Sequence, residues 1–174
     1  MRRPANTLGN VLAWLACVVC ISLTLSPSSF AQELYGEWRG SGFARPSIFG
    51  KKEKIYCKII GKASGPGKSE LSGRCATTTK SRKFSLQITE TGGNAVKAVA
   101  NIAGSAKPFA FTGRKQTSGY VMHSDEPTTQ EGIVFTSQFV ISFSGSTKMM
   151  MRQTAVNIDT GKQVTVVNTA FKKQ

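Results

Sequence analysis

The sequence has one histidine and nine acidic residues in 174, so it offers little material for acid–base catalysis. His123 is followed by Ser124 and Asp125, but neighbours in a strand point to opposite faces, so these three cannot form a triad. The acids are scattered, and no pair of carboxylates indicates glycoside hydrolysis. No glycine-rich phosphate loop lies between a strand and a helix. The sequence therefore predicts a protein that is not an enzyme and that holds no cofactor.

Residues for soft-metal binding are also scarce. Met149, Met150 and Met151 are consecutive. In a strand only the first and the last would share a face, which favours core packing over copper binding. Cys17 and Cys20 form a Cys-x-x-Cys pair, but both lie inside an apolar N-terminal run. We therefore predict no metal site.

Long apolar runs are absent except near the N-terminus. The run from Val11 to Leu25 has 15 residues, follows Met1-Arg2-Arg3 and precedes small residues that end at Ala31. A spanning helix needs about 20 residues, so this pattern predicts a signal peptide over residues 1–31 rather than a membrane anchor. The residues before Cys17 and Cys20 match a lipidation site poorly. Residues 32–174 then form one domain with no membrane span, in the bacterial periplasm or secreted.

Removal of residues 1–31 leaves two cysteines, Cys57 and Cys75. In an oxidising compartment a structural disulfide is the default for such a pair, and the long separation disfavours a redox or metal site. The residues Gly61 to Lys68 between them are typical of a turn, and alternating strand-like residues flank it. We predict a hairpin in which Cys57 faces Cys75, with Leu71 on the same face, so that the disulfide fixes the register of two strands.

The rest of the chain alternates between short strand-like runs and turn residues, and it shows no convincing helix. About ten strands at such regular spacing predict an all-β fold. The expected architecture is a single antiparallel up-and-down β-barrel of about 8–10 strands with one disulfide hairpin, and a sandwich is the alternative. The predicted strands lie near residues 34–43, 55–60, 71–75, 84–89, 96–102, 109–111, 120–122, 133–143, 148–156 and 163–171.

The first predicted strand contains Gly36-Glu37-Trp38. A Gly-x-Trp at this place resembles the calycin group, which includes lipocalins and avidins, and the resemblance implies that Gly36 and Trp38 close one end of a barrel. Calycins usually pack a late arginine on this tryptophan, whereas the last strand here offers Lys172 and Lys173. Residues 36–42 followed by the disulfide hairpin are also similar to small exported proteins of alphaproteobacteria that have no established function.

The same outline is similar to that of the periplasmic inhibitors of bacterial metalloproteases, which are small calycin-like barrels with one early disulfide hairpin. Those inhibitors act through a short free N-terminal tail. Here Gln32-Glu33-Leu34 would leave almost no tail before the barrel. An inhibitor of a protease or another hydrolase therefore stays as an alternative function.

The mature chain is strongly basic. Loss of Arg2 and Arg3 leaves 21 basic residues against 9 acidic ones, a net charge of +12. Lys54, Lys58 and Lys62 share parity, opposite to that of Cys57, and are expected to form an outward anion-binding stripe. A field of this sign attracts an anionic envelope polymer or an acidic protein, although it can also be a solvated face only, and export argues against nucleic acid. The expected function is that of an exported binding or envelope-associated protein.

Overall fold

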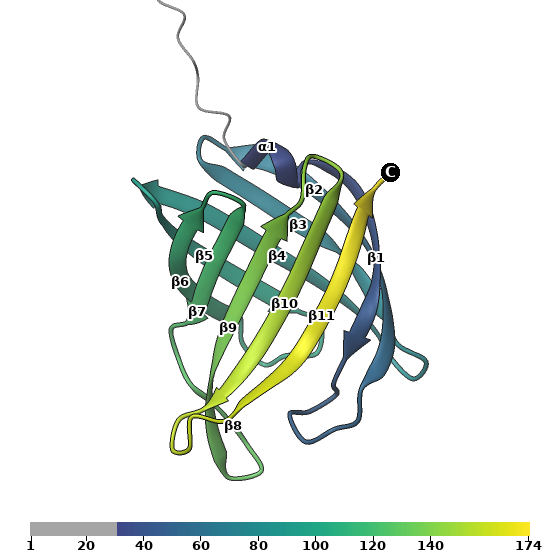
Figure 1. Ribbon diagram of the computed structural model, residues 1–174, viewed down its shortest axis with the longest axis vertical. Helices are drawn as coiled ribbons and strands as arrows, with labels where there is room; N and C mark the ends of the chain where they lie inside the picture. Colours follow the sequence, from purple (N-terminus) through teal and green to yellow (C-terminus); the bar gives the residue numbers. More distant parts are fainter. Residues whose placement is uncertain (1–30) are drawn as a thin grey trace, which may run out of the picture.

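The computed structural model describes residues 31–174, and ten of the eleven strands in this part of the chain close into a ring (Figure 1). The ring runs β1-β2-β3-β4-β5-β6-β7-β9-β10-β11 and back to β1, and every pair is antiparallel; β8 pairs only with β9. The predicted antiparallel barrel is thus confirmed, with β8 as an extra strand. The elements are α1 (Ala31–Leu34), β1 (Gly36–Ala44), β2 (Glu53–Gly65), β3 (Lys68–Ala76), β4 (Ser81–Gly92), β5 (Ala95–Ile102), β6 (Phe109–Gln116), β7 (Gly119–Ser124), β8 (Thr128–Gln130), β9 (Ile133–Phe143), β10 (Lys148–Asn157) and β11 (Gln163–Lys173).

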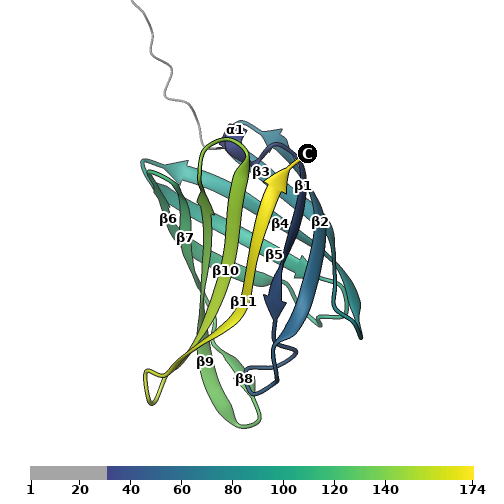
Figure 2. The ribbon, with the colours of Figure 1, turned by 45° about the vertical axis from the view of Figure 1, so that its right-hand side comes forward.

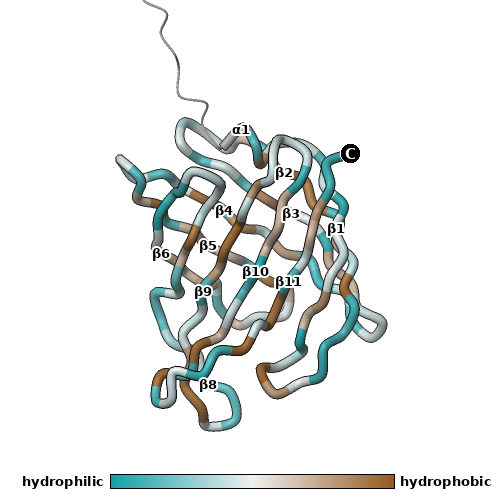
Figure 3. Tube along the Cα trace, in the orientation of Figure 1, coloured by the Kyte–Doolittle hydropathy of each residue, from teal (hydrophilic) through white to brown (hydrophobic). Residues whose placement is uncertain are grey.

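Alternation along each strand decides which side chains enter the barrel. In β2, Ile55, Cys57 and Ile59 are buried, whereas the residues between them are exposed. The same alternation recurs in β5, β6 and the first half of β10. Apolar and polar segments follow one another along the strands in Figure 3. Because a closed ring has no free edge, each strand can send one row of apolar side chains inward and one polar row outward.

The disulfide joins β2 to β3 as predicted. Cys57 and Cys75 are cross-strand partners with a sulfur–sulfur distance of 2.03 Å. Leu71 is fully buried on the same face of β3. The bridge therefore ties the first hairpin together from inside the barrel and holds its register.

One end of the barrel is covered by the short helix α1, which lies across the upper end in Figures 1 and 2. The sequence shows no convincing helix, and α1 has only four residues. The expectation that Leu34 belongs to the first strand is wrong, since Leu34 ends α1 and is fully buried. Gly61 makes this close approach possible, because a Cβ there would lie 1.8 Å from the carbonyl oxygen of Leu34. Gly36 has a φ of 111° and turns the chain from α1 into β1.

Trp38 fills this covered end. Its side chain is 1% exposed, and its Nε1 donates a hydrogen bond of 2.9 Å to the carbonyl oxygen of Leu34. Ile59 lies opposite Trp38 on β2, and Lys173 lies opposite it on β11. The helix, the tryptophan and the last strand thus meet at one place and close the barrel.

The other end is only partly covered. The β1–β2 loop folds toward the β8–β9 hairpin, where the backbone nitrogen of Ile48 donates to Gln130 Oε1 and Phe49 packs edge-on to Phe135. Ile48, Phe135 and Ala155 form a small second core there. This cluster packs the β1–β2 loop against β9 and β10 at this end of the barrel.

Candidate functional site

A cavity of about 480 Å³ opens at the end of the barrel away from α1. Its walls come from inward positions of β1–β6 and β9–β11, which are mostly apolar. The volume falls in the range of small-molecule pockets, which are commonly apolar with a few polar groups. The inner wall includes Cys57, Leu86, Phe111, Phe139, Met151 and Phe171.

Glycine at position 40 helps to shape this inner wall. A Cβ at Gly40 would lie 2.4 Å from the Phe171 ring, so only glycine lets that ring lie flat against β1. Phe111 and Phe139 face one another with ring centres 6.1 Å apart. Bulky rings from three separate strands therefore line the cavity.

Charged side chains gather at the rim of the cavity. Arg45, Lys80, Arg82 and Glu53 all line it, three cations against one acid. Arg82 Nη1 donates to the carbonyl oxygen of Ala103 at 2.7 Å, so its guanidinium is held at the rim. An anionic group at this mouth would meet an excess of positive charge.

Arg45 and Glu53 have structural partners as well. Arg45 Nη1 donates to the carbonyl oxygen of Gly50 at 2.6 Å, and its Nε donates to that of Thr165 at 3.3 Å. Glu53 Oε2 accepts a bond of 3.2 Å from the Thr79 hydroxyl. These two side chains therefore brace the loops around the mouth, and Lys80 and Arg82 add two further positive charges to it.

One polar group lies deep in the cavity. Thr169 is 1% exposed and lines the wall, and its Oγ1 has no hydrogen-bond partner among the described residues. A buried hydroxyl without a partner costs free energy, so most buried hydroxyls have one. Thr169 therefore offers a hydrogen bond to a molecule inside the barrel.

The closed end contains a second group of polar side chains. Lys115 Nζ lies 3.0 Å from Glu90 Oε1, and the Tyr120 hydroxyl donates to the same oxygen at 3.4 Å. Burial raises the pKa of Tyr120 above its usual value, and the nearby Glu90 carboxylate acts in the same direction. Burial also raises the pKa of Glu33 on α1, while Lys173 partly offsets this. These groups lie away from the cavity mouth and tie the closed end together.

The three predicted anion-binding lysines all lie on the outer side of β2. Lys54, Lys58 and Lys62 are exposed, and each is opposite in parity to the buried Cys57. They differ in their neighbours: Lys62 Nζ lies 3.5 Å from Glu70, and Lys54 Nζ lies 5.2 Å from the centre of the Tyr56 ring. The stripe therefore exists as a surface. Among residues 31–174, Lys58 has neither an ion-pair partner nor an aromatic ring beside its charge.

The residues that the sequence offered for catalysis or metal binding do not come together in the structure. His123 is exposed on β7, and the neighbouring Ser124 Oγ accepts a hydrogen bond from the Ser137 backbone nitrogen on β9. Met149 and Met151 are buried in the core, while Met150 points outward. Among residues 31–174, no group of three or more His, Cys, Asp or Glu side chains could hold a metal ion. Cys17, Cys20 and the rest of residues 1–30 lie outside the described part of the chain. The predicted cleavage after Ala31 would fall within α1 and stays a prediction.

Sequence reasoning did not find the cavity or its rim. Alternation along their own strands predicts that Phe109, Phe111 and Phe139 point inward. The space left between these side chains depends on the diameter of the barrel. Arg82 lies in a run of basic residues, which is typical of an exposed surface. The sequence feature that could have identified Arg82 is its position, because Arg82 alternates in step with the inward-pointing Phe84 and Leu86 on β4.

No protein-family model matches the sequence, and neither does any curated protein. The fold is similar to that of solved structures. An S-type phycobiliprotein lyase, CPES, from Guillardia theta matches with a TM-score of 0.56 and 11% identity, over 83% of this chain and 90% of the other. A redesigned β-barrel, mFAP1, bound to DFHBI matches with a TM-score of 0.45 and 10% identity, over 83% and 97%. The lyase and this chain thus share a fold, which is a ten-stranded antiparallel barrel here, and this likeness concerns the fold alone.

No helix among residues 31–174 is long and apolar enough to cross a membrane. The disulfide is compatible with export, since such bonds persist in oxidising compartments.

Proposed function

We propose that this protein is an exported binding protein that takes a small apolar ligand with an anionic end into its barrel. The open cavity carries the proposal: its walls are apolar, its rim has three cations against one acid, and Thr169 has an unused hydroxyl inside. An apolar body would displace water from the walls, and the anion would stay at the rim beside Lys80 and Arg82.

The proposal keeps two expectations from the sequence. The chain is taken to act in the bacterial periplasm or outside the cell, as a relative of the small exported alphaproteobacterial proteins that residues 36–42 resemble. It also keeps an anionic partner, but in place of the expected envelope polymer or acidic protein this partner is a small molecule at the cavity rim. The phycobiliprotein lyase supports only the fold, so it does not identify the ligand.

A titration with two fluorescent probes tests the cavity. All eleven strands and the disulfide lie within residues 32–174, which therefore serve as the protein for the experiments. 1-Anilinonaphthalene-8-sulfonate carries an anion, and 1-N-phenylnaphthylamine does not. We expect both to bind, the sulfonate more tightly, and laurate to displace them.

Two alanines provide matched variants. Ala100 lines the cavity from β5, whereas Ala110 points outward on the adjacent β6. Ala100→Phe should fill the cavity and weaken both probes at least about tenfold, while Ala110→Phe should leave them unchanged. Lys80→Ser with Arg82→Ser should weaken only the anionic probe. Equal probe affinities in Ala100→Phe and Ala110→Phe would overturn the proposal.

The alternative of a protein inhibitor has its own test. Leu34, which would belong to an inhibitory tail, is buried in α1, and no other feature of the described residues favours that function. The test adds residues 32–174 to a bacterial metalloprotease at the concentrations used in the probe titration. Inhibition of the protease together with no binding of either probe would support the inhibitor and contradict the proposed ligand-binding cavity.

A further inference from the structure

Six cations lie in one row across the outer wall of the barrel. Each faces the next on the adjacent strand, and all six side chains are exposed, on the parity opposite to the buried face. Like charges directly opposite one another destabilise a sheet, so this arrangement costs stability instead of providing it. The row, called here the basic row, consists of Lys148, Lys172, Arg39, Lys58, Arg74 and Lys83 on β10, β11, β1, β2, β3 and β4.

Little negative charge compensates the basic row. Two acids, Glu37 and Glu70, occupy outward positions on these six strands, and Glu70 lies 3.5 Å from Lys62. Within residues 31–174 no member of the basic row takes part in an ion pair. The wall therefore presents a positive field that is free to act on an anionic partner.

Exposed apolar side chains lie among these cations. Tyr56 and Ile60 are 55% and 53% exposed and lie two residues before and after Lys58, and Met150 is 43% exposed two residues after Lys148. Cations mixed with exposed aromatic and aliphatic side chains are typical of surfaces that enter the headgroup layer of a membrane. A wall used only for solubility would not need these apolar groups.

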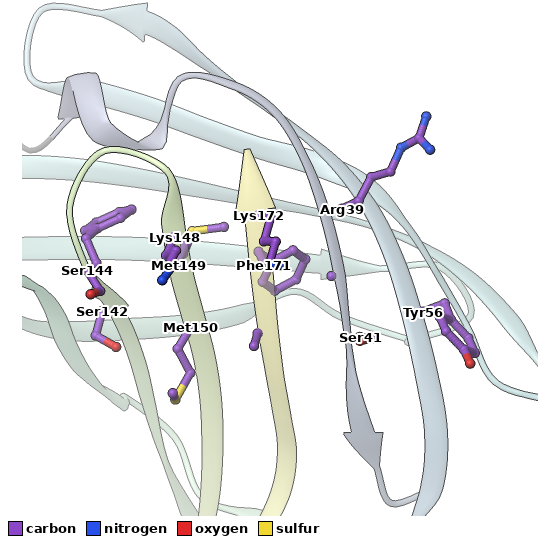
Figure 4. Close-up of a pocket in the computed structure, with 13 residues that line it drawn as sticks. Arg39, Ser41, Tyr56, Ser142, Ser144, Lys148, Met149, Met150, Phe171 and Lys172 are labelled. Atoms are coloured by element: carbon purple, nitrogen blue, oxygen red, sulfur yellow. The ribbon is translucent and has the colours of Figure 1, made fainter. Parts of the chain in front are cut away.

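A shallow groove of about 640 Å³ runs over β11 beside the same cations. Small side chains make its floor, including Ala170 and Ser41. In Figure 4, Lys148 and Met150 lie to one side of β11, and Arg39 and Tyr56 lie to the other. The groove therefore combines an apolar floor with cations at its sides, as a lipid with a charged headgroup requires.

We propose that this outer wall binds a membrane surface that carries anionic lipid headgroups. The headgroup phosphates contact the basic row, while Tyr56, Ile60 and Met150 enter the interfacial layer and the groove over β11 accepts part of a lipid. Strands are about 4.8 Å apart, so the row extends about 24 Å around a curved wall, and its central members meet a flat surface first. Arg39 and Lys58 are the central pair. This surface is separate from the cavity, and neither proposal depends on the other.

Sedimentation with lipid vesicles tests the proposal. Residues 32–174 should bind vesicles of phosphatidylcholine with phosphatidylglycerol at low salt, bind them far less at high salt, and not bind phosphatidylcholine alone. Arg39→Ser with Lys58→Ser should weaken binding about thirtyfold. The matched control is Lys97→Ser with Arg114→Ser, which removes the same charge from exposed positions of β5 and β6 and should change binding less than about threefold.

A second pair of variants separates a lipid surface from a soluble polyanion. Tyr56→Ser with Ile60→Ser should weaken vesicle binding and leave the binding of inorganic polyphosphate unchanged, whereas Val99→Ser, an exposed position on β5, should change neither. Equal losses in the two charge variants would overturn the proposal, because net charge alone would then explain binding. Polyphosphate binding with no effect of the apolar changes on vesicles would overturn the lipid assignment. Circular dichroism on each variant shows that the barrel is intact.

Discussion

Lys173 Nζ lies 5.3 Å from the centre of the Trp38 ring, so a lysine of the last strand lies over the tryptophan of the first strand. A cation over an indole face is attracted by the ring quadrupole. The two residues are also cross-strand partners on β11 and β1. The first and last strands of the barrel are thus joined at the closed end through one side-chain pair as well as through the backbone.

This pair predicts a large cost for losing the tryptophan. Trp38→Ala should lower the free energy of unfolding by about 3–5 kcal/mol, and Lys173→Met by about 0.5–1 kcal/mol. Trp14 lies in the first 31 residues, so Trp38 is the only tryptophan of residues 32–174 and its fluorescence reports on this end directly. We expect a blue-shifted emission that moves to the red on unfolding in denaturant. A solvent-like maximum in the folded protein would contradict the buried position.

The basic row predicts that one charge reversal stabilises the protein. Lys58 faces Arg39 on one side and Arg74 on the other, so Lys58→Glu turns two repulsive pairs into two attractive ones. We expect the free energy of unfolding to rise by about 1 kcal/mol at low salt, which is about 2–4 °C in the melting temperature. The measurement is a thermal melt at low and high salt, since salt should shrink the difference.

Lys97→Glu is the matched control, because Lys97 is flanked by Thr89 and Thr112 in place of two arginines. It should change the melting temperature by much less than Lys58→Glu does. A lower melting temperature for Lys58→Glu at low salt would contradict the repulsion that the register implies.

The closed end predicts a loss of stability in alkaline solution. Burial and the Glu90 carboxylate raise the pKa of the Tyr120 hydroxyl, so the folded protein keeps this proton while the unfolded chain releases it near pH 10. The stabilising contribution is therefore complete below about pH 10 and is lost as the pH rises beyond that value. Unfolding in guanidinium at about pH 9 and about pH 11 measures the loss.

Tyr120→Phe separates this effect from the titration of other groups. The variant loses the bond to Glu90 and should be less stable than the native chain at about pH 9, yet it should lose less stability on going to about pH 11. Parallel losses in both proteins would show that the Tyr120 hydroxyl ionises in the folded state.

Local features of the sequence predicted the first hairpin correctly. The turn residues and the alternation on both sides place Cys57 opposite Cys75 without reference to the rest of the chain. The predicted turn over Gly61–Lys68 is too long, since β2 continues to Gly65 and β3 begins at Lys68. The strand rhythm likewise predicted the barrel, since alternation over many short segments needs a closed or two-layered sheet. Helix α1 was not predicted, because four residues are too few to show a 3.6-residue period.

Features that depend on register between distant strands could not be predicted in the same way. Lys172 and Arg39 are 133 positions apart, and their alignment follows from how the last strand pairs with the first. The stripe of Lys54, Lys58 and Lys62 runs along one strand and was visible in the sequence, whereas the basic row runs across six strands. The cavity depends on the same long-range closure, because the number of strands fixes the width of the barrel.

The unpaired hydroxyl of Thr169 gives the last prediction. Thr169 is 1% exposed, and its Oγ1 has no partner among the described residues, so Thr169→Val should raise the free energy of unfolding by about 1 kcal/mol with little change in shape. Thr112→Val, at an exposed outward position of β6, is the control for the change in strand propensity and should have a smaller effect. Unfolding in denaturant measures both. A clear loss of stability in Thr169→Val would mean that a bound water already satisfies the hydroxyl. A gain would mean that the chain keeps a buried polar group at a cost to its own stability, as expected of a group that meets a ligand in the cavity.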